Sequence, residues 1–337
     1  MLDHATLDKV DYRDRQPELF RADVLAGLTS RQKTLPSRWL YDDKGSVLFE
    51  EITRLPEYYP TRAETAILSR NAGEIAALIG PDAVVIEYGA GAGIKTEILI
   101  EALQTPRLYV PVDIAADFLD ETVVRFRRRF AGVPAWPVVA DFTGSFDIPR
   151  SVPAAPRAGF FPGSTIGNLD AGQTRAFLRR MRAHVGDLGA ALIGVDLKKD
   201  IGLLLAAYDD AQGVTAAFNL NLLTRINREL DGDFDLRRFA HEARWNDQES
   251  AVEMHLVSLE NQTVTVAGQR IDFTIGETIH TESSRKYDLA GFTAVVEREG
   301  WRVGAIWSDP GEQFGVFGLI AADLPGAPPP SRSLLPS

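Results

Sequence analysis

The chain has 337 residues, of which 45% are apolar and 25% are charged, and its formal net charge is −11. This composition is typical of a globular protein long enough for two domains, and the acidic balance argues against a nucleic acid partner, which requires a positive field. The absence of cysteine excludes disulfides, thiolate nucleophiles and cysteine-ligated metal sites, and the five histidines show no metal-binding spacing, so we expect no metal.

The N-terminal twenty residues mix both charge signs and contain no apolar core, which argues against a signal or transit peptide. No uncharged apolar run reaches the length needed to span a membrane. We therefore expect a cytoplasmic protein, monomeric, with neither a membrane nor a nucleic acid as partner.

The first clear helix follows the stretch "PTRAETAIL", in which Thr61 and Glu64 have the spacing of a capping box. Apolar residues between positions 67 and 79 then share one helical face, and a Gly-Pro pair ends the pattern. The sequence therefore predicts one helix over this range.

Short apolar strands alternate with helices over the next part of the chain. Five such strands are visible: "AVVIEYG", "LYVPVDI", "WPVVADF", "AGFFPGS" and "AALIGVDL". Apolar strands separated by helices predict a parallel sheet that is covered on both faces. The helix before the fifth strand has a capping box formed by Asp170 and Gln173.

The alternation stops near residue 199. Residues 199–230 have a helical pattern, whereas residues 243–275 alternate with the period of strands and include Ala267-Gly268 as a turn. A further helix ended by Gly300 and two strands joined by a Pro-Gly turn complete the pattern. The proline-rich tail, residues 323–337, is expected to be disordered.

These patterns predict an α/β domain whose parallel sheet is interrupted by a second, α+β unit. We assign residues 61–198 and 287–322 to the first domain. The second domain is formed by residues 14–60 together with the insertion, residues 199–286.

The loop after the first strand, "EYGAGAGIKT", distinguishes between two kinds of ligand. The dinucleotide fingerprint requires a third glycine where this chain has Ile94, so that fingerprint fails. The chain instead places Glu87 two residues before the first glycine of the loop, Gly89, which Gly91 follows, as Rossmann-like methyltransferases do. A carboxylate at this point can reach the ammonium group of S-adenosylmethionine, whereas it would repel a pyrophosphate.

Further acids end the next two strands. Asp113 ends the second strand, where a carboxylate can accept both ribose hydroxyls, and Asp141-Phe142 ends the third, where an acid can bind the adenine amino group and an aromatic ring can flank the base. Three strand-end acids in this order favour S-adenosylmethionine over NAD as the ligand. We therefore predict a Rossmann-like S-adenosylmethionine-dependent methyltransferase domain with a second α+β substrate domain; an NAD-dependent oxidoreductase is the alternative from another class.

The stretch "GFFPGSTIGNLD" ends the fourth strand, beside the point where such sheets bind ligands. Gly163 and Gly167 would let the backbone approach a small substrate, and Asn168 offers a donor and an acceptor to an amino acid, unless it only caps the next helix. On composition alone, "YDDKGSVLFEEITRLPEYYPTRAE" is a packed helix with aromatic anchors and "HTESSRK" is a surface loop.

These stretches resemble the histidine-specific Nα-methyltransferases of ergothioneine biosynthesis, a family that makes the betaine hercynine from L-histidine. The resemblance covers residues 34–322 and is carried by "YDDKGS-LFEEITRLPEYYPTRAE", "GSTIGN", "AYDDAQGVTAAFN-N-L--INREL" and "TE-S". The two-domain plan of that family matches the break inferred above. The chain departs from the family in its glycine loop, which has Tyr88 and a third glycine where a Leu or Phe and a Ser/Thr-rich turn are usual.

The resemblance implies a set of site residues. S-adenosylmethionine would be bound by Tyr58, Gly89, Lys95, Asp113, Asp141 and Phe142, to which the loop pattern adds Glu87 and Gly91. The amino-acid part of the substrate would be bound by Tyr41, Gly163, Asn168 and Tyr208, with Tyr58 beside it, and its imidazole ring by Glu282 and Ser284, with Met254 nearby.

An acid and a hydroxyl suit the two nitrogens of an imidazole and fit an indole poorly, so Glu282 and Ser284 favour L-histidine as the substrate. The expected reaction is threefold methylation of the α-amino group to hercynine, with Tyr41 and Asn168 as the catalytic pair. Tyr41 would accept a hydrogen bond from the amine, although a reference pKa near 10 makes a tyrosine a poor general base. The alternatives are a methyltransferase of another amine, such as an indole amino acid, and a non-catalytic S-adenosylmethionine-binding protein.

Overall fold

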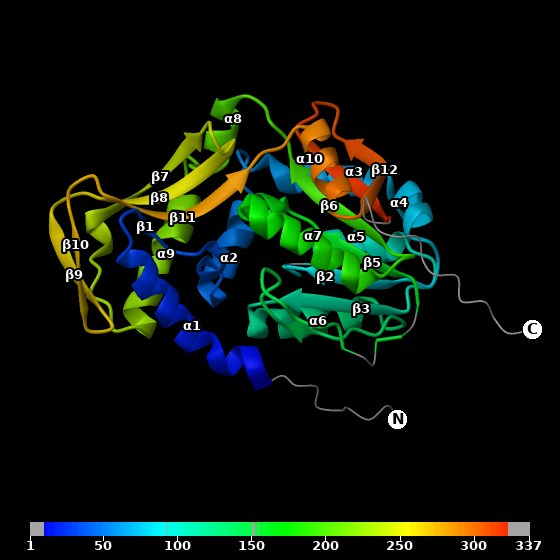
Figure 1. Ribbon diagram of the computed structural model, residues 1–337, viewed down its shortest axis with the longest axis horizontal. Coiled ribbons are helices and arrows are strands. Elements are labelled where there is room, and N and C mark those ends of the chain that lie inside the picture. Colours follow the sequence, from blue (N-terminus) through cyan, green and yellow to red (C-terminus); the bar gives the residue numbers. More distant parts are fainter. Residues whose placement is uncertain (1–9, 92, 150–151, 154, 323–337) are drawn as a thin grey trace, which may run out of the picture.

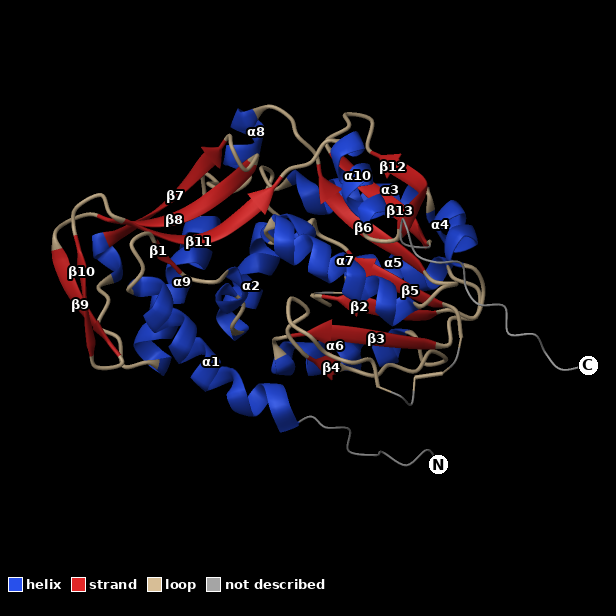
Figure 2. Cartoon of the chain, viewed as in Figure 1, coloured by secondary structure: helices blue, strands red, loops and turns tan. Residues whose placement is uncertain are grey.

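The computed structural model describes residues 10–91, 93–149, 152–153 and 155–322, and their side chains from residue 15. The predicted disordered tail, residues 323–337, lies outside the described residues. Among these residues the chain forms a seven-stranded sheet, a four-stranded sheet and a separate hairpin. The two sheets lie beside one another, each with its own helices (Figures 1 and 2).

The larger sheet has the strand order β12-β13-β6-β5-β2-β3-β4. Its strands are β2 (Val84–Tyr88), β3 (Leu108–Asp113), β4 (Val138–Val139), β5 (Arg157–Phe161), β6 (Ala190–Asp196), β12 (Trp301–Ser308) and β13 (Phe314–Ala321). The strands from β4 to β6 pair in parallel, and β13 and β12 pair antiparallel at one edge. The predicted parallel sheet with a closing antiparallel pair, a Rossmann-like α/β fold, is confirmed.

Helices cover both faces of this sheet. They are α3 (Tyr59–Arg70), α4 (Ala72–Ile79), α5 (Ile94–Ala102), α6 (Ala116–Arg129), α7 (Ala171–Val185) and α10 (Leu289–Arg298), with the 3-10 turn η2 (Thr165–Asn168). Apolar residues of α3 to α6 form the core on one face, and those of α7 and α10 form the core on the other. We call this part the seven-stranded region. Because the chain moves from β2 outward to β4 and then returns to β5, the β2–β5 boundary is a topological switch point.

The smaller sheet has the order β1-β11-β8-β7. Its strands are β1 (Lys33–Thr34), β7 (Phe239–Asn246), β8 (Ala251–Ser258) and β11 (Thr278–Arg285), and the hairpin is β9 (Gln262–Val266) and β10 (Gln269–Phe273). The helices packed with it are α1 (Val10–Leu28), α2 (Asp43–Ile52), α8 (Ile201–Ala206) and α9 (Val214–Glu229), with the 3-10 turns η1 (Ser37–Leu40) and η3 (Leu236–Arg238). These elements share one core, to which Trp39 and Leu222 both belong, and we call them the four-stranded region.

Several local predictions are confirmed by the geometry. The Asp170 carboxylate accepts from the backbone of Gln173 and the Gln173 side chain accepts in return, so α7 begins with a capping box. Val266 pairs with Gln269 across the predicted Ala267-Gly268 turn.

Three other local predictions are wrong. The expected single helix over residues 61–79 is two helices that meet at Asn71, and the first begins at Tyr59 without a side-chain cap. Thr61 and Glu64 therefore form no capping box; Glu64 is fully buried instead. The stretch "HTESSRK", expected as a surface loop, provides most of β11, the strand that pairs with both β1 and β8.

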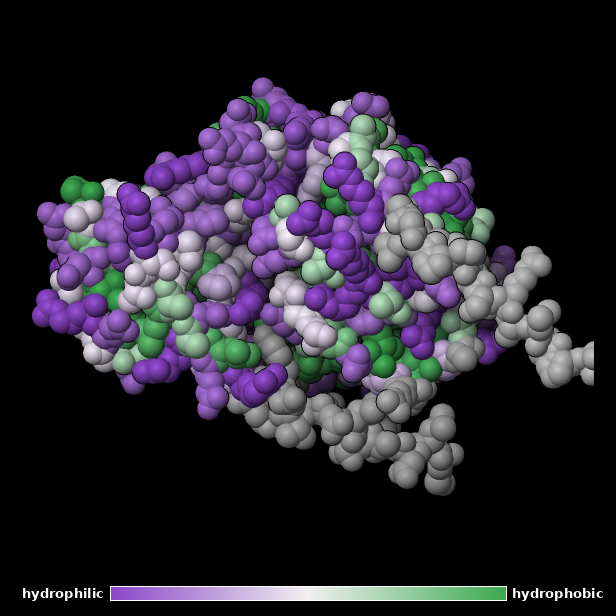
Figure 3. Space-filling view, viewed as in Figure 1, coloured by the Kyte–Doolittle hydropathy of each residue, from purple (hydrophilic) through white to green (hydrophobic). Residues whose placement is uncertain are grey.

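Most atoms on the face seen in Figure 3 are hydrophilic, and the hydrophobic patches there are small and separate. In the part of the chain that the structure describes, no helix is both long and apolar enough to cross a bilayer.

A close backbone contact joins the two regions at Gly167 in η2. A Cβ at this position would lie 2.7 Å from the backbone oxygen of Arg285 in β11 and 3.3 Å from Oγ of Ser284. Gly167 was expected to admit a substrate, but the backbone that it admits is that of the neighbouring strand.

Gly167→Ala should therefore destabilise the protein, because the clashing atom is backbone and cannot rotate away. We expect a loss of about 1–3 kcal/mol in the free energy of unfolding, measured by urea denaturation. Gly73→Ala in α4 is the matched control, because a Cβ there meets no atom within 4 Å. Equal effects of the two substitutions would contradict the proposed role of Gly167.

Candidate active site

A pocket opens between the two regions, at the carboxyl end of β5. All eight residues that were expected to bind substrate line it: Tyr41, Tyr58, Gly163, Asn168, Tyr208, Met254, Glu282 and Ser284. The remaining lining residues were not predicted: Phe49, Ile52, Ser164, Thr165, Ala207, Thr215 and Phe218. The structure thus brings the predicted substrate residues together, while their roles stay predictions.

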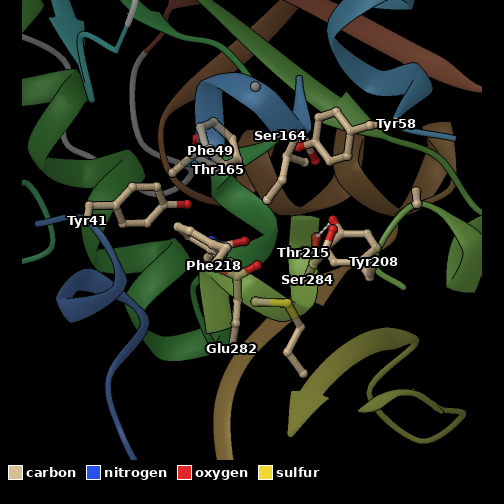
Figure 4. Close-up of a pocket in the computed structure, with 15 residues that line it drawn as sticks. Tyr41, Phe49, Tyr58, Ser164, Thr165, Tyr208, Thr215, Phe218, Glu282 and Ser284 are labelled. Atoms are coloured by element: carbon tan, nitrogen blue, oxygen red, sulfur yellow. Dashed lines mark hydrogen bonds between the residues drawn. The ribbon is translucent and has the colours of Figure 1, made fainter. Parts of the chain in front are cut away.

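Strand β11 supplies the acid and the hydroxyl. Glu282 and Ser284 are two positions apart, and alternate residues of a strand point to the same face, so both side chains face the pocket. Met254 pairs with Glu282 across β8 and β11 and forms part of the pocket floor. In Figure 4 the Glu282 carboxylate and the Tyr41 hydroxyl point into the same space.

Aromatic rings form much of the remaining wall. The Tyr41 ring lies 5.5 Å, between centroids, from both Phe49 and Phe218, and the Tyr58 ring lies 6.5 Å from that of Tyr208. Burial raises the pKa of Tyr41, Tyr58 and Tyr208 well above the ordinary value. These phenols are therefore neutral at physiological pH, and their π faces suit a cationic group.

Glu282 has a fixed partner within the pocket. Asn168 Nδ2 donates to Glu282 Oε2 at 3.1 Å, which joins the end of η2 to β11. Burial raises the pKa of Glu282 to about 7, although Lys286 and Asn168 both act in the opposite direction. The carboxylate is therefore poised to change its protonation state near neutral pH.

The turn before η2 has an unusual backbone. Gly163 and Ser164 both adopt positive φ angles, 81° and 58°, and Ser164 is not a glycine. Ser164 Oγ accepts a hydrogen bond from the backbone N–H of Asp196 at 2.8 Å, which offsets the strain of this conformation. The turn thereby presents the backbone of Gly163 to the pocket.

Six of the expected cofactor residues lie at or near the carboxyl ends of β2, β3 and β4: Glu87, Gly89, Gly91, Asp113, Asp141 and Phe142. Tyr58 lines the substrate pocket instead, and Lys95 lies in the first turn of α5. Gly89 and Gly91 have positive φ angles of 76° and 32°, which only glycine adopts readily. The Asp113 carboxylate accepts from the backbone N–H of Ala115 at 2.9 Å. A Cβ at Gly89 would lie 3.5 Å from the Phe142 ring, so the loop and the ring after β4 are in contact range.

Asp141, next to that ring, is held in place by two groups. Its Oδ1 accepts from the backbone of Thr143 at 2.8 Å, and its Oδ2 lies 3.4 Å from an Arg38 nitrogen. A glycine loop, two strand-end carboxylates and a flanking aromatic ring together fit the methionyl, ribose and adenine parts of S-adenosylmethionine.

Lys95 has a partner that the sequence did not predict. Its ammonium donates to Glu64 Oε2 at 2.5 Å, and the same oxygen accepts from the Gly163 backbone at 2.8 Å. Glu64 Oε1 is buried and has no hydrogen-bond partner among the described residues. The sequence does contain one indication that Glu64 is buried. It lies three residues before Ile67 and four before Leu68, so it shares the buried face of the helix with them.

Glu87 differs from the expectation. Its carboxylate is 2% exposed and accepts hydrogen bonds from the hydroxyls of Thr96 and Tyr109. Burial raises the pKa of Glu87 to about 8, so the neutral acid is the form that this environment favours at pH 7. This environment does not favour a charged carboxylate at the ammonium of the methyl donor, and the role of Glu87 there stays a prediction.

One group of metal-binding residue types lies elsewhere in the four-stranded region. Glu253, His255 and His280 each place one ligand-type atom within 4.8 Å of the others. His255 Nε2 and Glu253 Oε2 are 3.1 Å apart and satisfy each other, and none of the three residues lines the pocket. This group therefore has no part in the chemistry of the pocket.

Comparison with known proteins identifies the family. The model of the histidine-specific, S-adenosylmethionine-dependent methyltransferases matches residues 20–321. The chain belongs to this family. A histidine N-alpha-methyltransferase of Mycolicibacterium smegmatis is 41% identical over 92% of this chain and 98% of its own length. Its counterpart from Mycobacterium tuberculosis is 41% identical over 88% of this chain and 93% of its own length.

A third relative is a much longer protein. Ergothioneine biosynthesis protein 1 of Neurospora crassa is 34% identical over 58% of this chain, which corresponds to 23% of that protein.

The burial of Glu87 predicts a pH-dependent stability. A carboxyl with a folded pKa of about 8 and a reference value of 4.5 holds its proton more tightly in the folded state. The free energy of unfolding should therefore fall by up to about 1.4 kcal/mol per pH unit between these two values. Glu87→Gln removes this loss, so the variant should gain stability relative to wild type as the pH rises.

Urea denaturation at about pH 5, 6.5 and 8 measures the difference, with Glu121→Gln at an exposed position of α6 as a charge-matched control. A difference between Glu87→Gln and wild type that does not change with pH would contradict the neutral, buried state of Glu87.

Proposed function

We propose that the chain transfers three methyl groups to the α-amino group of L-histidine and forms hercynine, the first step of ergothioneine biosynthesis. The observation that carries this proposal is the pair Glu282 and Ser284, which face one pocket from the same side of β11. The family and the two histidine N-alpha-methyltransferases that cover nearly the whole chain support the same reaction.

S-adenosylmethionine supplies the methyl group when it is bound. On this proposal the backbone at Gly89 and Gly91 lies close to the bound donor, and Asp113 binds the ribose hydroxyls. Asp141 binds the adenine amino group and Phe142 flanks the adenine ring, as their positions at the strand end suggest. Lys95 would bind the methionyl carboxylate, because its ammonium lies beside the Gly163 turn.

The pocket would orient L-histidine from both ends. Asn168 and the Gly163 backbone suit its carboxylate and amine, while Glu282 and Ser284 suit the two ring nitrogens. Proximity of this kind is the main contribution that an enzyme makes to an in-line transfer between two bound molecules. An indole has a single N–H and no ring nitrogen lone pair, so it would leave one of the two β11 groups without a partner.

Tyr41 is proposed to orient the amine. Each transfer requires a neutral amine, and the raised pKa of Tyr41 keeps its phenol neutral. In the first two transfers the neutral amine still carries an N–H, and the Tyr41 oxygen can accept a hydrogen bond from it. The rings of Tyr41, Phe49, Tyr58 and Phe218 surround the space in which positive charge accumulates as methyl groups are added. Neutral aromatic rings stabilise such a charge without a competing hydrogen bond.

The remaining proposals concern the organisation and surroundings of the protein. We propose that residues 61–198 with 287–322 bind the methyl donor and that residues 14–60 with 199–286 bind the substrate. The four-stranded region has a core separate from the two cores on the faces of the larger sheet, which accords with this division. We also propose a monomeric, cytoplasmic enzyme that needs no metal. The net charge of −11 supports the absence of a nucleic acid partner.

Mass spectrometry of the products tests the function directly. The purified protein is incubated with S-adenosylmethionine and, separately, L-histidine, L-tryptophan, L-tyrosine or histamine, each with and without EDTA. We expect three methyl groups on L-histidine, none on histamine because it lacks the carboxylate, and no effect of EDTA. Methylation of tryptophan alone would refute the reading of Glu282 and Ser284, and tight donor binding without transfer would indicate a non-catalytic protein.

Tyr41→Phe tests the orienting role of the hydroxyl. We expect kcat to fall about tenfold, which corresponds to the loss of one hydrogen bond near the reacting amine, with the Kd for S-adenosylhomocysteine unchanged. Because the ring packing against Phe49 and Phe218 is retained, the thermal stability should also be unchanged. An unchanged kcat would remove Tyr41 from the mechanism.

A further inference from the structure

A buried ion pair lies directly behind the substrate pocket. Asp196, at the end of β6, is 1% exposed, and Lys286, just after β11, is fully buried. Lys286 Nζ lies 2.7 Å from Asp196 Oδ2, so the pair joins the seven-stranded region to the four-stranded region. Burial alone would raise the pKa of Asp196, but Lys286 and Lys199 lower it, and the carboxylate is ionised.

All three protons of the Lys286 ammonium have acceptors. One is donated to Asp196, a second to Tyr208 Oη at 2.9 Å, and the third to Ser284 Oγ at 2.8 Å. A lysine ammonium has three donors and no acceptor capacity. Tyr208 and Ser284, whose hydroxyls both line the pocket, therefore each use a lone pair on Lys286.

The hydrogen bonds that Ser284 accepts determine what its hydroxyl can offer the pocket. Tyr208 Oη lies 2.7 Å from Ser284 Oγ and donates to it, because a phenol is a stronger acid than an alcohol (Figure 4). Ser284 Oγ thus accepts from both Tyr208 and Lys286, and a serine hydroxyl has only two lone pairs. Its remaining capacity is its own proton, so towards the pocket Ser284 acts as a hydrogen-bond donor.

We propose that Lys286 is a positioning residue that fixes Ser284 as a donor and thereby selects the neutral form of the substrate imidazole. This inference rests on the proposed function, since it assigns the hydrogen bonds of the same site. Neutral imidazole carries one N–H and one lone pair. The N–H matches the Glu282 carboxylate and the lone pair matches the Ser284 proton, whereas imidazolium would place a second N–H against that proton.

The second lysine of the cluster provides a matched control. Lys199 Nζ lies 2.5 Å from Asp196 Oδ1 and 2.6 Å from Tyr59 Oη. In the described part of the chain it has no hydrogen bond to Ser284 or Tyr208. Replacement of either lysine by methionine leaves Asp196 with a single cationic partner, but only the Lys286 change frees the lone pair of Ser284.

Calorimetric binding of L-histidine to the protein saturated with S-adenosylhomocysteine is the first measurement. We expect Lys286→Met to raise the Kd about tenfold and Lys199→Met to change it less than about twofold. In a Ser284→Ala background, Lys286→Met should raise the Kd by a further factor of less than about three, because the two residues act as a unit. An equal rise in Kd for the two lysine substitutions would overturn the proposal. So would a double variant whose rise in Kd equals the product of the rises for Lys286→Met and Ser284→Ala alone.

A second measurement needs no variant and remains valid if Lys286→Met does not fold. The Kd of L-histidine is divided by that of 3-(1,2,4-triazol-3-yl)alanine, whose ring stays neutral in mild acid, so that titration of Glu282 affects both ligands alike. The ratio should rise as the pH falls below about 6.5, the reference pKa of imidazole. A ratio that stays flat or falls on acidification would show that the site accepts imidazolium and would refute the inference.

The same experiments separate this inference from the proposed function. A wild-type protein that binds L-histidine but transfers no methyl group would refute the proposed function and leave the role of Lys286 to be decided by the Kd values. A wild-type protein that does not bind L-histidine would refute both.

Discussion

The ion pair between Asp196 and Lys286 is the interaction on which the rest of the site depends. Each ion loses its hydration on burial, which costs several kcal/mol, and that cost is offset only when every donor and acceptor finds a partner. Here Asp196 is bound by two lysines and by the Tyr59 hydroxyl, and Lys286 by Asp196 and two hydroxyls. The network therefore fixes the separation of the two regions, and the pocket between them inherits that geometry.

A second constraint is the narrow space between η2 and β11. Gly167 lets the backbone of β11 approach within a distance that no other residue type allows, and Asn168, the next residue, bonds to Glu282. On the other side of the turn, the Gly163 backbone bonds to Glu64, which also holds Lys95. A short loop thus connects the group expected to bind the methyl donor with the group expected to bind the substrate ring.

The sequence predicted the parts of this fold that local pattern determines. Strands β2 to β6, the Asp170 cap and the closing antiparallel pair follow from apolar runs and turn chemistry. The break at Asn71 was missed because the apolar face continues across it, and β11 was missed because its polar residues face a pocket. The pair of Asp196 and Lys286 is ninety residues apart in sequence, and no periodic signal connects such positions.

The layout of β11 has a consequence for how such proteins diversify. Its pocket-facing positions alternate with positions that pair or pack elsewhere, and its backbone is held between β1 and β8 whatever side chains it carries. The residues at the ends of β2 to β4 belong to a different sheet. Glu282 has no hydrogen bond to Lys286 or Asp196 among the described residues, so its substitution can change which amine enters while the methyl donor, the sheet and the ion pair behind the pocket remain as they are. The choice of amine is thus separated, strand by strand, from the binding of the methyl donor.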